Sequence, residues 1–204
     1  MIQLHNNIPV CILDPDEHGI ALDLKFIHKF ICDIEPKIME LEPAHWFQVG
    51  PTQDIYEQDD LTSRWTEWNI FLYKEKKLHD LFRVFCKGVA ELISYLDIET
   101  DKNLYMGAWA NLCRAGEIIP CHAHNFFLNG HIAINADNTF TIYEFDQCEV
   151  SIPNKNGQLI LTLTGFNHWT SPWKDEIDPR TTVAVDILDR KTPNAAPVFP
   201  IFLP

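Results

Sequence analysis

Three histidines lie close together in the segment 120–131, which reads PCHAHNFFLNGH. His122 and His124 are separated by a single residue. On a β-strand, residues i and i+2 point to the same face, so a strand here would direct both imidazoles into one cavity. Imidazole is a common ligand of divalent iron, zinc, copper and nickel. The spacing therefore predicts a pair of metal ligands, and a third ligand must come from elsewhere in the chain.

The best candidate for the third ligand is His168, which follows an apolar run in the segment LTLTGFNHWTSPW. At one mouth of a barrel of strands, His168 can lie beside the first pair and leave coordination positions open for redox chemistry. His131 follows His124 at an odd offset, which turns it to the other face of an unbroken strand, so we expect it not to be a ligand. We expect the other histidines to be structural or exposed: His5, His18, His28, His45 and His79.

Arg180 begins the segment RTTVAVDIL, twelve residues after His168. A guanidinium can bind both oxygens of a carboxylate at once, and a neighbouring hydroxyl can donate a further hydrogen bond. Thr182 lies two residues further on and would share the face of Arg180 on a strand. The pattern suits the capture of a carboxylate, although Arg180 taken alone would be read as a surface arginine that follows a turn.

The second half of the chain consists of short apolar or alternating runs, separated by turn-forming segments such as NADN, PNKNG and DPR. Runs of this kind predict β-strands joined by turns. The predicted strands lie in residues 103–116, 126–135, 139–145, 148–153, 157–165 and 181–188. Many short strands favour an antiparallel sandwich or jelly roll over a parallel sheet.

The first half of the chain is expected to be mainly helical. Apolar residues at steps of three and four predict helices over 22–41 and 75–95, and Pro36 should end or kink the first of them. Residues 43–64 are rich in polar and turn-forming residues and are predicted to form a long loop, followed by a strand over 65–73.

We therefore expect one domain over residues 1–204, mainly β with a helical N-terminal half (α+β). Residues 1–100 would supply helical support, with a loop and an edge strand. Residues 101–190 would form a double-stranded β-helix core, a cupin-like jelly roll that carries the metal site and is backed by the two helices. Residues 191–204 would form a C-terminal tail.

The composition excludes several classes of function. The chain has 29 acidic and 16 basic residues and a formal net charge of −13, whereas non-specific nucleic-acid binding depends on Lys and Arg. No apolar run approaches the roughly 20 residues of a membrane span, and the N-terminal segment lacks the features of a signal peptide. The six cysteines form no CxxC pair and should be buried free thiols. We expect a cytoplasmic protein that binds neither nucleic acid nor membrane and acts on a small-molecule or peptidyl substrate.

Segments 109–135 and 157–187 together resemble the non-haem iron, 2-oxoglutarate-dependent oxygenases. Within this family they look closest to a group frequent in phages and marine bacteria, which carries the motif H-x-H…H…R. The match runs from about residue 105 to residue 188. The residues that carry it are Trp109, Asn111, Gly116, His122, His124, Asn129, Gly130, Gly157, His168 and Arg180.

The resemblance implies that His122 and His168 bind Fe(II). Arg180 would hold the distal carboxylate of 2-oxoglutarate, with Thr182 in the place of the usual Ser and Asn111 beside the co-substrate. His124 stands where these enzymes usually place an Asp or Glu ligand, and a neutral imidazole there leaves the metal site more positive. The substrate pocket is expected to include Trp109, Trp169, Trp173, Asn129 and His131.

Two other functions fit part of the pattern. The segment GEIIPCHAH also matches the first cupin pattern, which would give a metalloprotein that does not use 2-oxoglutarate and in which Arg180 has no special role. The Glu expected shortly after H-x-H and the second cupin pattern are absent, however. The histidine at position 124 also fits a catalytically inactive jelly roll that acts as a binding module. Dependence of activity on both Fe(II) and 2-oxoglutarate would distinguish the oxygenase from the other two.

Overall fold

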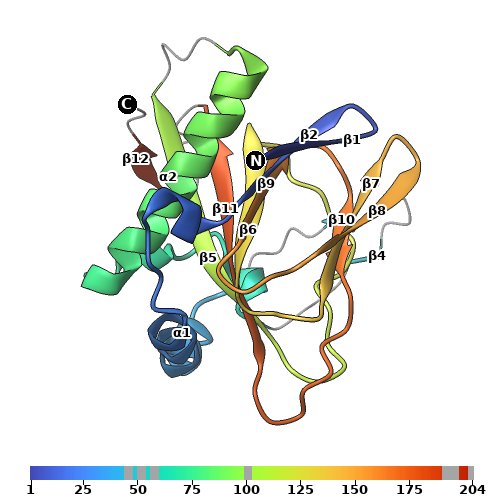
Figure 1. Ribbon diagram of the computed structural model, residues 1–204. Helices are drawn as coiled ribbons and strands as arrows, with labels where there is room; N and C mark the ends of the chain where they lie inside the picture. The colour runs from blue at the N-terminus through green and yellow to red at the C-terminus, as the bar shows by residue number, and fades with distance from the viewer. Residues whose placement is uncertain (44–47, 50–53, 56–59, 99–102, 190–197, 202–204) are drawn as a thin grey trace.

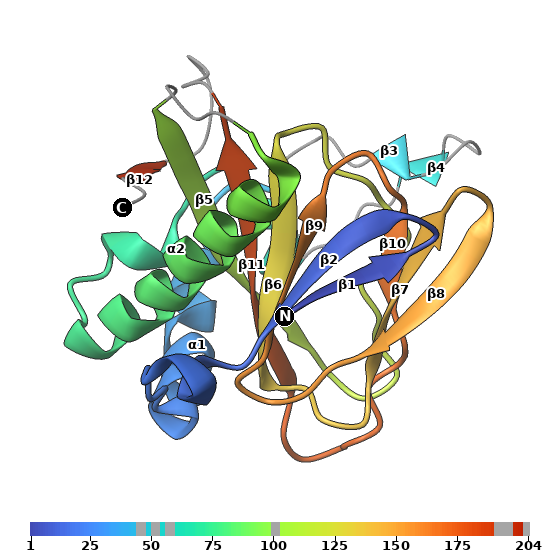
Figure 2. The ribbon, with the colours of Figure 1, turned by 45° about the horizontal axis from the view of Figure 1, so that its top comes forward.

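Two β-sheets face each other, and two helices cover the outer face of the larger sheet (Figure 1, Figure 2). The main hydrophobic core lies between the helices and the larger sheet, and a smaller apolar cluster lies between the two sheets. The computed structural model describes residues 1–43, 48–49, 54–55, 60–98, 103–189 and 198–201. The expected architecture, mainly β with helices backing one face, is confirmed.

The larger sheet is antiparallel and has seven strands. They are β1 (Ile2–His5), β2 (Ile8–Leu13), β5 (Leu104–Cys113), β6 (Leu128–Asn135), β9 (Leu159–Leu163), β11 (Arg180–Leu188) and β12 (Phe199–Ile201). Their order is β1-β2-β9-β6-β11-β5-β12. The smaller sheet has the order β10-β7-β8 and consists of β7 (Phe140–Phe145), β8 (Cys148–Pro153) and β10 (His168–Thr170). A separate two-stranded sheet pairs β3 (Gln48–Val49) with β4 (Asp54–Ile55). Each of the six segments predicted as strands in the second half contains one.

Strand β11 lies between β5 and β6 in the larger sheet, and its residues alternate between the two faces. The odd-numbered positions from 181 to 187 face the helices and are completely buried. The even-numbered positions face the smaller sheet and are Arg180, Thr182, Ala184 and Asp186. This alternation places polar side chains inside the molecule along one face of a buried strand.

Helices α1 (Leu24–Ile38) and α2 (Lys76–Leu96) pack their apolar stripes against the larger sheet. The carboxylate of Asp23 caps α1 by accepting a hydrogen bond of 3.0 Å from the N–H of Phe26. Pro36 lies in the last turn of α1, where a proline removes only one backbone hydrogen bond before the helix ends. In α2, a Cβ at Gly88 would collide with the side chain of Leu159, so this glycine allows α2 to approach β9 closely.

The strand predicted over residues 65–73 is wrong. The chain forms a short 3₁₀ turn at Thr62–Arg64, just before this segment, and a second one at Ile70–Leu72 within it. The side chain of Asn69 explains the second turn, because its Oδ1 accepts from the N–H of Phe71 (3.0 Å) and its Nδ2 donates to the carbonyl of Met106 (3.1 Å). A turn capped by a local side chain thus forms in place of the β-strand that the aromatic residues of this segment would favour.

Three strands at the chain ends were not predicted. The first 13 residues form the hairpin β1–β2, which joins the larger sheet through β9, so residues 1–100 supply strands as well as helical support. The turn residues Asn6 and Asn7 have φ values of 48° and 64°, and asparagine tolerates this region better than most residues. In the predicted C-terminal tail, β12 pairs with β5 at the opposite edge. Most of that tail, 191–197 and 202–204, lies outside the described residues.

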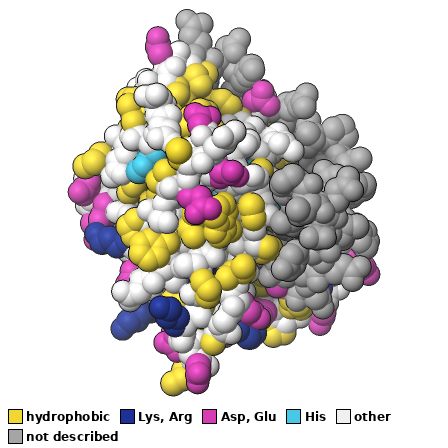
Figure 3. Space-filling view, turned by 90° about the vertical axis from the view of Figure 1, so that its right-hand side faces the viewer, with side chains coloured by type: hydrophobic (Ala, Val, Ile, Leu, Met, Phe, Trp, Pro, Cys, Tyr) yellow, Lys and Arg dark blue, Asp and Glu magenta, His cyan; other side chains and the backbone are white. Residues whose placement is uncertain are grey.

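The surface of the described residues agrees with the acidic composition. Figure 3 shows acidic side chains spread over one face, while basic side chains are confined to its lower half. Within the part of the chain that the structure describes, no helix has both the length and the apolar character to cross a membrane. All six cysteines are free thiols, but only Cys11 and Cys113 are buried as expected; Cys32, Cys86 and Cys121 are partly exposed, and Cys148 is exposed.

Candidate metal centre and anion pocket

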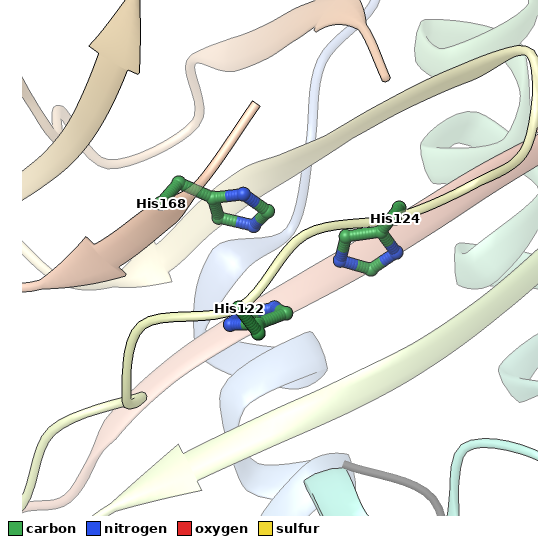
Figure 4. Close-up of side chains that lie close together, drawn as sticks. All are labelled: His122, His124 and His168. Carbon is green, nitrogen blue, oxygen red and sulfur yellow. The ribbon is translucent and has the colours of Figure 1, made fainter. Parts of the chain in front are cut away.

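Three histidines converge at one point inside the molecule. One ring nitrogen from each of His122, His124 and His168 lies within 4.8 Å of those of the other two. Figure 4 shows the three side chains turned toward one another. His122 and His168 are the closest pair, with ring centroids 4.3 Å apart. The predicted third histidine is therefore brought beside the H-x-H pair.

The backbone that positions these residues is not the strand that the sequence predicted. His122 forms an isolated bridge with His168, through hydrogen bonds of 3.0 and 2.8 Å between their backbone groups. His124 lies in an irregular segment. The backbone carbonyl of His124 accepts a hydrogen bond from the N–H of Gly165 (3.0 Å). Pro120 has no N–H to contribute to a regular ladder. The convergence thus comes from pairing of segment 119–124 with segment 165–170 rather than from one strand face.

A hydrogen-bond acceptor lies beside the Nδ1 atom of each ring. Nδ1 of His122 is 2.7 Å from the carbonyl oxygen of Pro120, and Nδ1 of His168 is 3.3 Å from that of Phe166. Nδ1 of His124 lies 2.8 Å from Oδ1 of Asp186. A carbonyl can only accept, so the contacts of His122 and His168 favour the tautomer with the proton on Nδ1 and the lone pair on Nε2. The negative charge of the Asp186 carboxylate favours the same tautomer of His124, although their contact lacks the geometry of a hydrogen bond. The Nε2 atoms are therefore the expected metal ligands.

The protonation states also suit metal binding. Burial lowers the pKa of His122 to about 3, with a smaller contribution from His124. Burial, followed by the neighbouring His122 and His124, lowers the pKa of His168 well below its usual value of 6.5. Metal ions compete with protons for the same lone pairs. At neutral pH, His122 and His168 are neutral donors.

The same cavity contains a buried cation. Arg180 is 1% exposed, and neither its Nε nor its Nη1 has a hydrogen-bond partner among the described residues. Burial lowers the pKa of its guanidinium, which is also hydrogen-bonded to the side chain of Cys113. A buried charge with unused donors is costly unless a ligand of opposite charge meets it. The arrangement therefore indicates an anion site.

A chain of side-chain hydrogen bonds orients the hydroxyl beside Arg180. Thr62 Oγ1 donates to Asn111 Oδ1 (2.9 Å), and Asn111 Nδ2 donates to Thr182 Oγ1 (3.2 Å). Because Thr182 accepts in this chain, its own proton remains able to bind an anion. Thr182, Asn111 and Arg180 all line the cavity that holds the histidines.

No protein-family model matches the chain, and no curated protein matches it either. Among solved structures, a prolyl-4-hydroxylase from Pseudomonas putida aligns with a TM-score of 0.54 and 13% identity, over 91% of this chain and 95% of that one. The fold is a double-stranded β-helix. A 2OG-Fe(II) oxygenase family oxidoreductase from Burkholderia pseudomallei aligns over 76% of this chain and 67% of that one, with a TM-score of 0.42 and 12% identity. A cupin domain from Bordetella pertussis aligns over 44% of this chain and 85% of that one, with a TM-score of 0.30 and 13% identity.

The residues predicted for the substrate pocket of this β-helix divide into two groups. Trp109, Asn129 and His131 line the cavity, and the Trp109 ring stacks on His124 at a centroid distance of 6.0 Å. Trp169 and Trp173 are not among the residues that line it. Trp173 is buried, and its Nε1 donates to the carbonyl of Asp178 (2.7 Å), which is a structural role.

His131 faces the cavity, although the seven-residue offset predicted that it would turn away from the metal ligands. The chain between His124 and β6 is irregular, so the alternation of one continuous strand does not apply. Nε2 of His131 contacts Asn154 Oδ1 (2.8 Å), and His131 is not part of the three-histidine group. His5, His18, His28 and His79 also lie outside that group, and His45 lies outside the described residues.

Thr62 and Asp186 are among the polar residues of the site that were not predicted from the sequence. Thr62 was assigned to the long loop and carried no recognisable pattern. Asp186 did carry a signal, because it is the one charged residue in the apolar segment VAVDIL and lies at an even offset from Arg180. On a strand, that offset places it on the same face as Arg180 and Thr182.

Lowering the pH should destabilise the metal-free protein. Burial lowers the pKa of His131 to about 4, whereas an unfolded chain has a histidine pKa of about 6.5. Between these values the unfolded state holds a proton that the folded state lacks. The free energy of unfolding should then fall by up to about 1.4 kcal/mol for each pH unit lost in this window. His122 and His168 act in the same direction, since their pKa values are also lowered.

Urea denaturation of the wild type and of His131→Gln, between about pH 5 and about pH 7, measures this dependence. The variant should lose stability less steeply as the pH falls, because one of the titrating groups is gone. Equal slopes for the two proteins would show that His131 is not buried in its neutral form.

Proposed function

We propose that the protein is an Fe(II)- and 2-oxoglutarate-dependent dioxygenase that hydroxylates a small-molecule or peptidyl substrate. The observation that carries this proposal is the buried guanidinium of Arg180, whose Nε and Nη1 have no partner among the described residues. It lines the same cavity as three imidazoles that point at one another. A metal-binding group and a carboxylate-binding group in one pocket suit a ligand that carries a chelating end and a distal carboxylate.

The donor set fits a divalent metal ion. Three buried or half-buried imidazoles offer one nitrogen each, and the acceptors beside their Nδ1 atoms hold the rings in place. A three-ligand set leaves coordination positions for a co-substrate. When bound, Fe(II) and 2-oxoglutarate together supply the oxidising chemistry with O₂, and the protein supplies binding, orientation and exclusion of water.

Each residue of the cavity then has a defined task. His122, His124 and His168 would hold the metal, and Arg180 would hold the distal carboxylate of 2-oxoglutarate. Thr182 would donate a further hydrogen bond to that carboxylate, from a hydroxyl already oriented by Asn111. Trp109 and Asn129 line the cavity and would contact the co-substrate or substrate.

A metal centre that does not use 2-oxoglutarate is the second candidate. His124 favours it, because a set of three neutral imidazoles lacks the carboxylate ligand usual in the oxygenases. It leaves Arg180 without a function, however, and a buried arginine with unused donors is destabilising. The free thiols of all six cysteines favour a reducing compartment for either protein, such as the cytoplasm.

Anaerobic titration of the metal-free protein with Fe(II), followed by 2-oxoglutarate, tests the proposal. Fe(II) should bind at micromolar concentration, and 2-oxoglutarate should then produce the charge-transfer absorbance of its iron chelate. On admission of O₂, succinate should form only when both are present. Binding of Fe(II) without any response to 2-oxoglutarate would favour the second candidate. Failure to bind Fe(II), Mn(II) or Zn(II) would indicate an inactive binding module.

A further inference from the structure

We propose that Asp186 is a positioning residue for the metal centre. In this role its carboxylate holds the His124 ring at Nδ1, the nitrogen that does not face the metal. It also supplies the negative charge that a histidine at position 124 cannot supply, without contacting the metal itself. The inference rests on the metal centre of the proposed function. It assigns to Asp186 a role in metal affinity without making it a ligand.

The first argument is the environment of the Asp186 carboxylate. Asp186 is 2% exposed, and neither of its oxygens has a hydrogen bond of good geometry with the described residues. Its close contact is the 2.8 Å separation between Oδ1 and Nδ1 of His124. Among the described residues, Asp186 forms no ion pair with a lysine or an arginine. A buried carboxylate without such partners destabilises the folded protein. A positive charge on the His124 ring, or on a metal ion bound to it, would offset this cost.

The second argument is the contrast among the three histidines. Neutral backbone carbonyls face Nδ1 of His122 and of His168, whereas a carboxylate faces Nδ1 of His124. A carboxylate beside the distal nitrogen of a metal-bound imidazole raises the basicity of the ligand and fixes the ring orientation. The charged partner thus belongs to the one histidine that occupies the position of the usual carboxylate ligand.

The third argument is the place of Asp186 in the sheet. Asp186 stands opposite Gly107 of β5 in the register of the larger sheet. Gly107 contributes no side chain, so this neighbour does not obstruct the carboxylate on the inner face. Asp186 is also separate from the group whose nitrogens lie within 4.8 Å of one another, which consists of His122, His124 and His168. The geometry therefore favours action through His124 over direct ligation.

Titration of the metal-free protein with Co(II) tests the inference without any catalytic assay. Asp186→Asn keeps the shape of the side chain and removes its charge, and should weaken Co(II) binding by about 10- to 100-fold. The positions of the Co(II) absorption bands should stay those of the wild type, because the ligands are unchanged. The matched control is Asp178→Asn, which makes the same change beside another histidine, His28 (2.9 Å), and should leave the affinity for Co(II) unaltered.

The stability of the metal-free variant separates positioning from a merely structural role. Removing a buried charge that has no aligned donor should leave the melting temperature of Asp186→Asn unchanged or raise it. Lower affinity combined with undiminished stability supports the inference. Lower affinity that accompanies a lower melting temperature in the metal-free state would overturn it, as would an affinity equal to that of the wild type.

A second background separates action through His124 from direct contact with the metal. In His124→Asp, a carboxylate takes the ligand position and the carboxylate of Asp186 faces it as a like charge. Adding Asp186→Asn there should strengthen Co(II) binding, the reverse of its effect beside His124. Equal weakening in both backgrounds would make Asp186 a ligand and overturn the inference. If the wild type itself binds no Co(II), the proposed function fails, whereas binding that is insensitive to Asp186→Asn defeats this inference alone.

Discussion

Replacing Arg180 by methionine should strongly weaken 2-oxoglutarate binding and, at the same time, stabilise the metal-free protein. The guanidinium is 1% exposed and leaves Nε and Nη1 without partners among the described residues. Methionine has a similar length and no charge to desolvate, and such replacements of buried charges raise stability by about 1–4 kcal/mol. Loss of a buried charged hydrogen-bond partner should weaken co-substrate binding by about 2–5 kcal/mol, or at least about 30-fold.

Two measurements on the same variant check these opposite effects. Thermal or urea denaturation gives the change in stability, and anaerobic titration with 2-oxoglutarate in the presence of Fe(II) gives the change in affinity. Fe(II) binding itself should be retained, because Arg180 is not one of the three histidine donors. An unchanged affinity for 2-oxoglutarate, or a less stable metal-free protein, would contradict the role of Arg180 as an anion site.

A second buried arginine provides a matched control. Arg64 is 4% exposed. Its guanidinium donates to the carbonyls of Leu41 (3.0 Å), Asp60 (2.9 Å) and Met39 (3.3 Å). Arg64→Met leaves these carbonyls without their partner and should destabilise the protein by at least about 2 kcal/mol. Opposite signs for the two arginine variants would show that Arg180 is kept for a ligand and not for the fold.

The strands of the second half were predictable because their signals are local. The prediction for residues 148–153 coincides with β8, since alternating residues and flanking turns are adjacent in the chain. The segment 65–73 failed because a single side chain, Asn69, captures the backbone groups that a strand would have used. The N-terminal hairpin was missed although its Asn6–Asn7 turn is a recognised hairpin signal.

The candidate site also depends on contacts between distant segments that no local sequence pattern predicts. Residue types and spacing were sufficient to select His122, His124 and His168, but the reason given for their convergence was wrong. The rings meet because segment 119–124 pairs with segment 165–170, and no local pattern records such a pairing. Asp186 could have been found, because its even offset from Arg180 places both on one face of a strand. Its contact with His124 could not be read from the sequence, since it depends on how an irregular segment crosses β11.

Replacing His168 by glutamine should remove nearly all metal binding. Structural zinc sites with four ligands bind with about 10–16 kcal/mol, so an equal share is about 2.5–4 kcal/mol for each ligand. Loss of one donor of three should therefore weaken the affinity for Co(II) or Fe(II) by about 10²- to 10³-fold. The metal should also stop raising the melting temperature, because that increase depends on the ratio of metal concentration to Kd.

His131→Gln is the control that separates loss of a metal ligand from a general loss of packing in the cavity. His131 is a buried histidine that lines the same cavity, and burial lowers its pKa as it does for His168. Its Nε2 contacts Asn154, however, and it does not belong to the converging group. The two variants make the same chemical change at comparable depth, so a general loss of packing would affect both alike. Metal affinity that falls for His168→Gln alone identifies a coordination site, whereas an equal fall in both variants would mean that the cavity, and not the three-histidine set, governs binding.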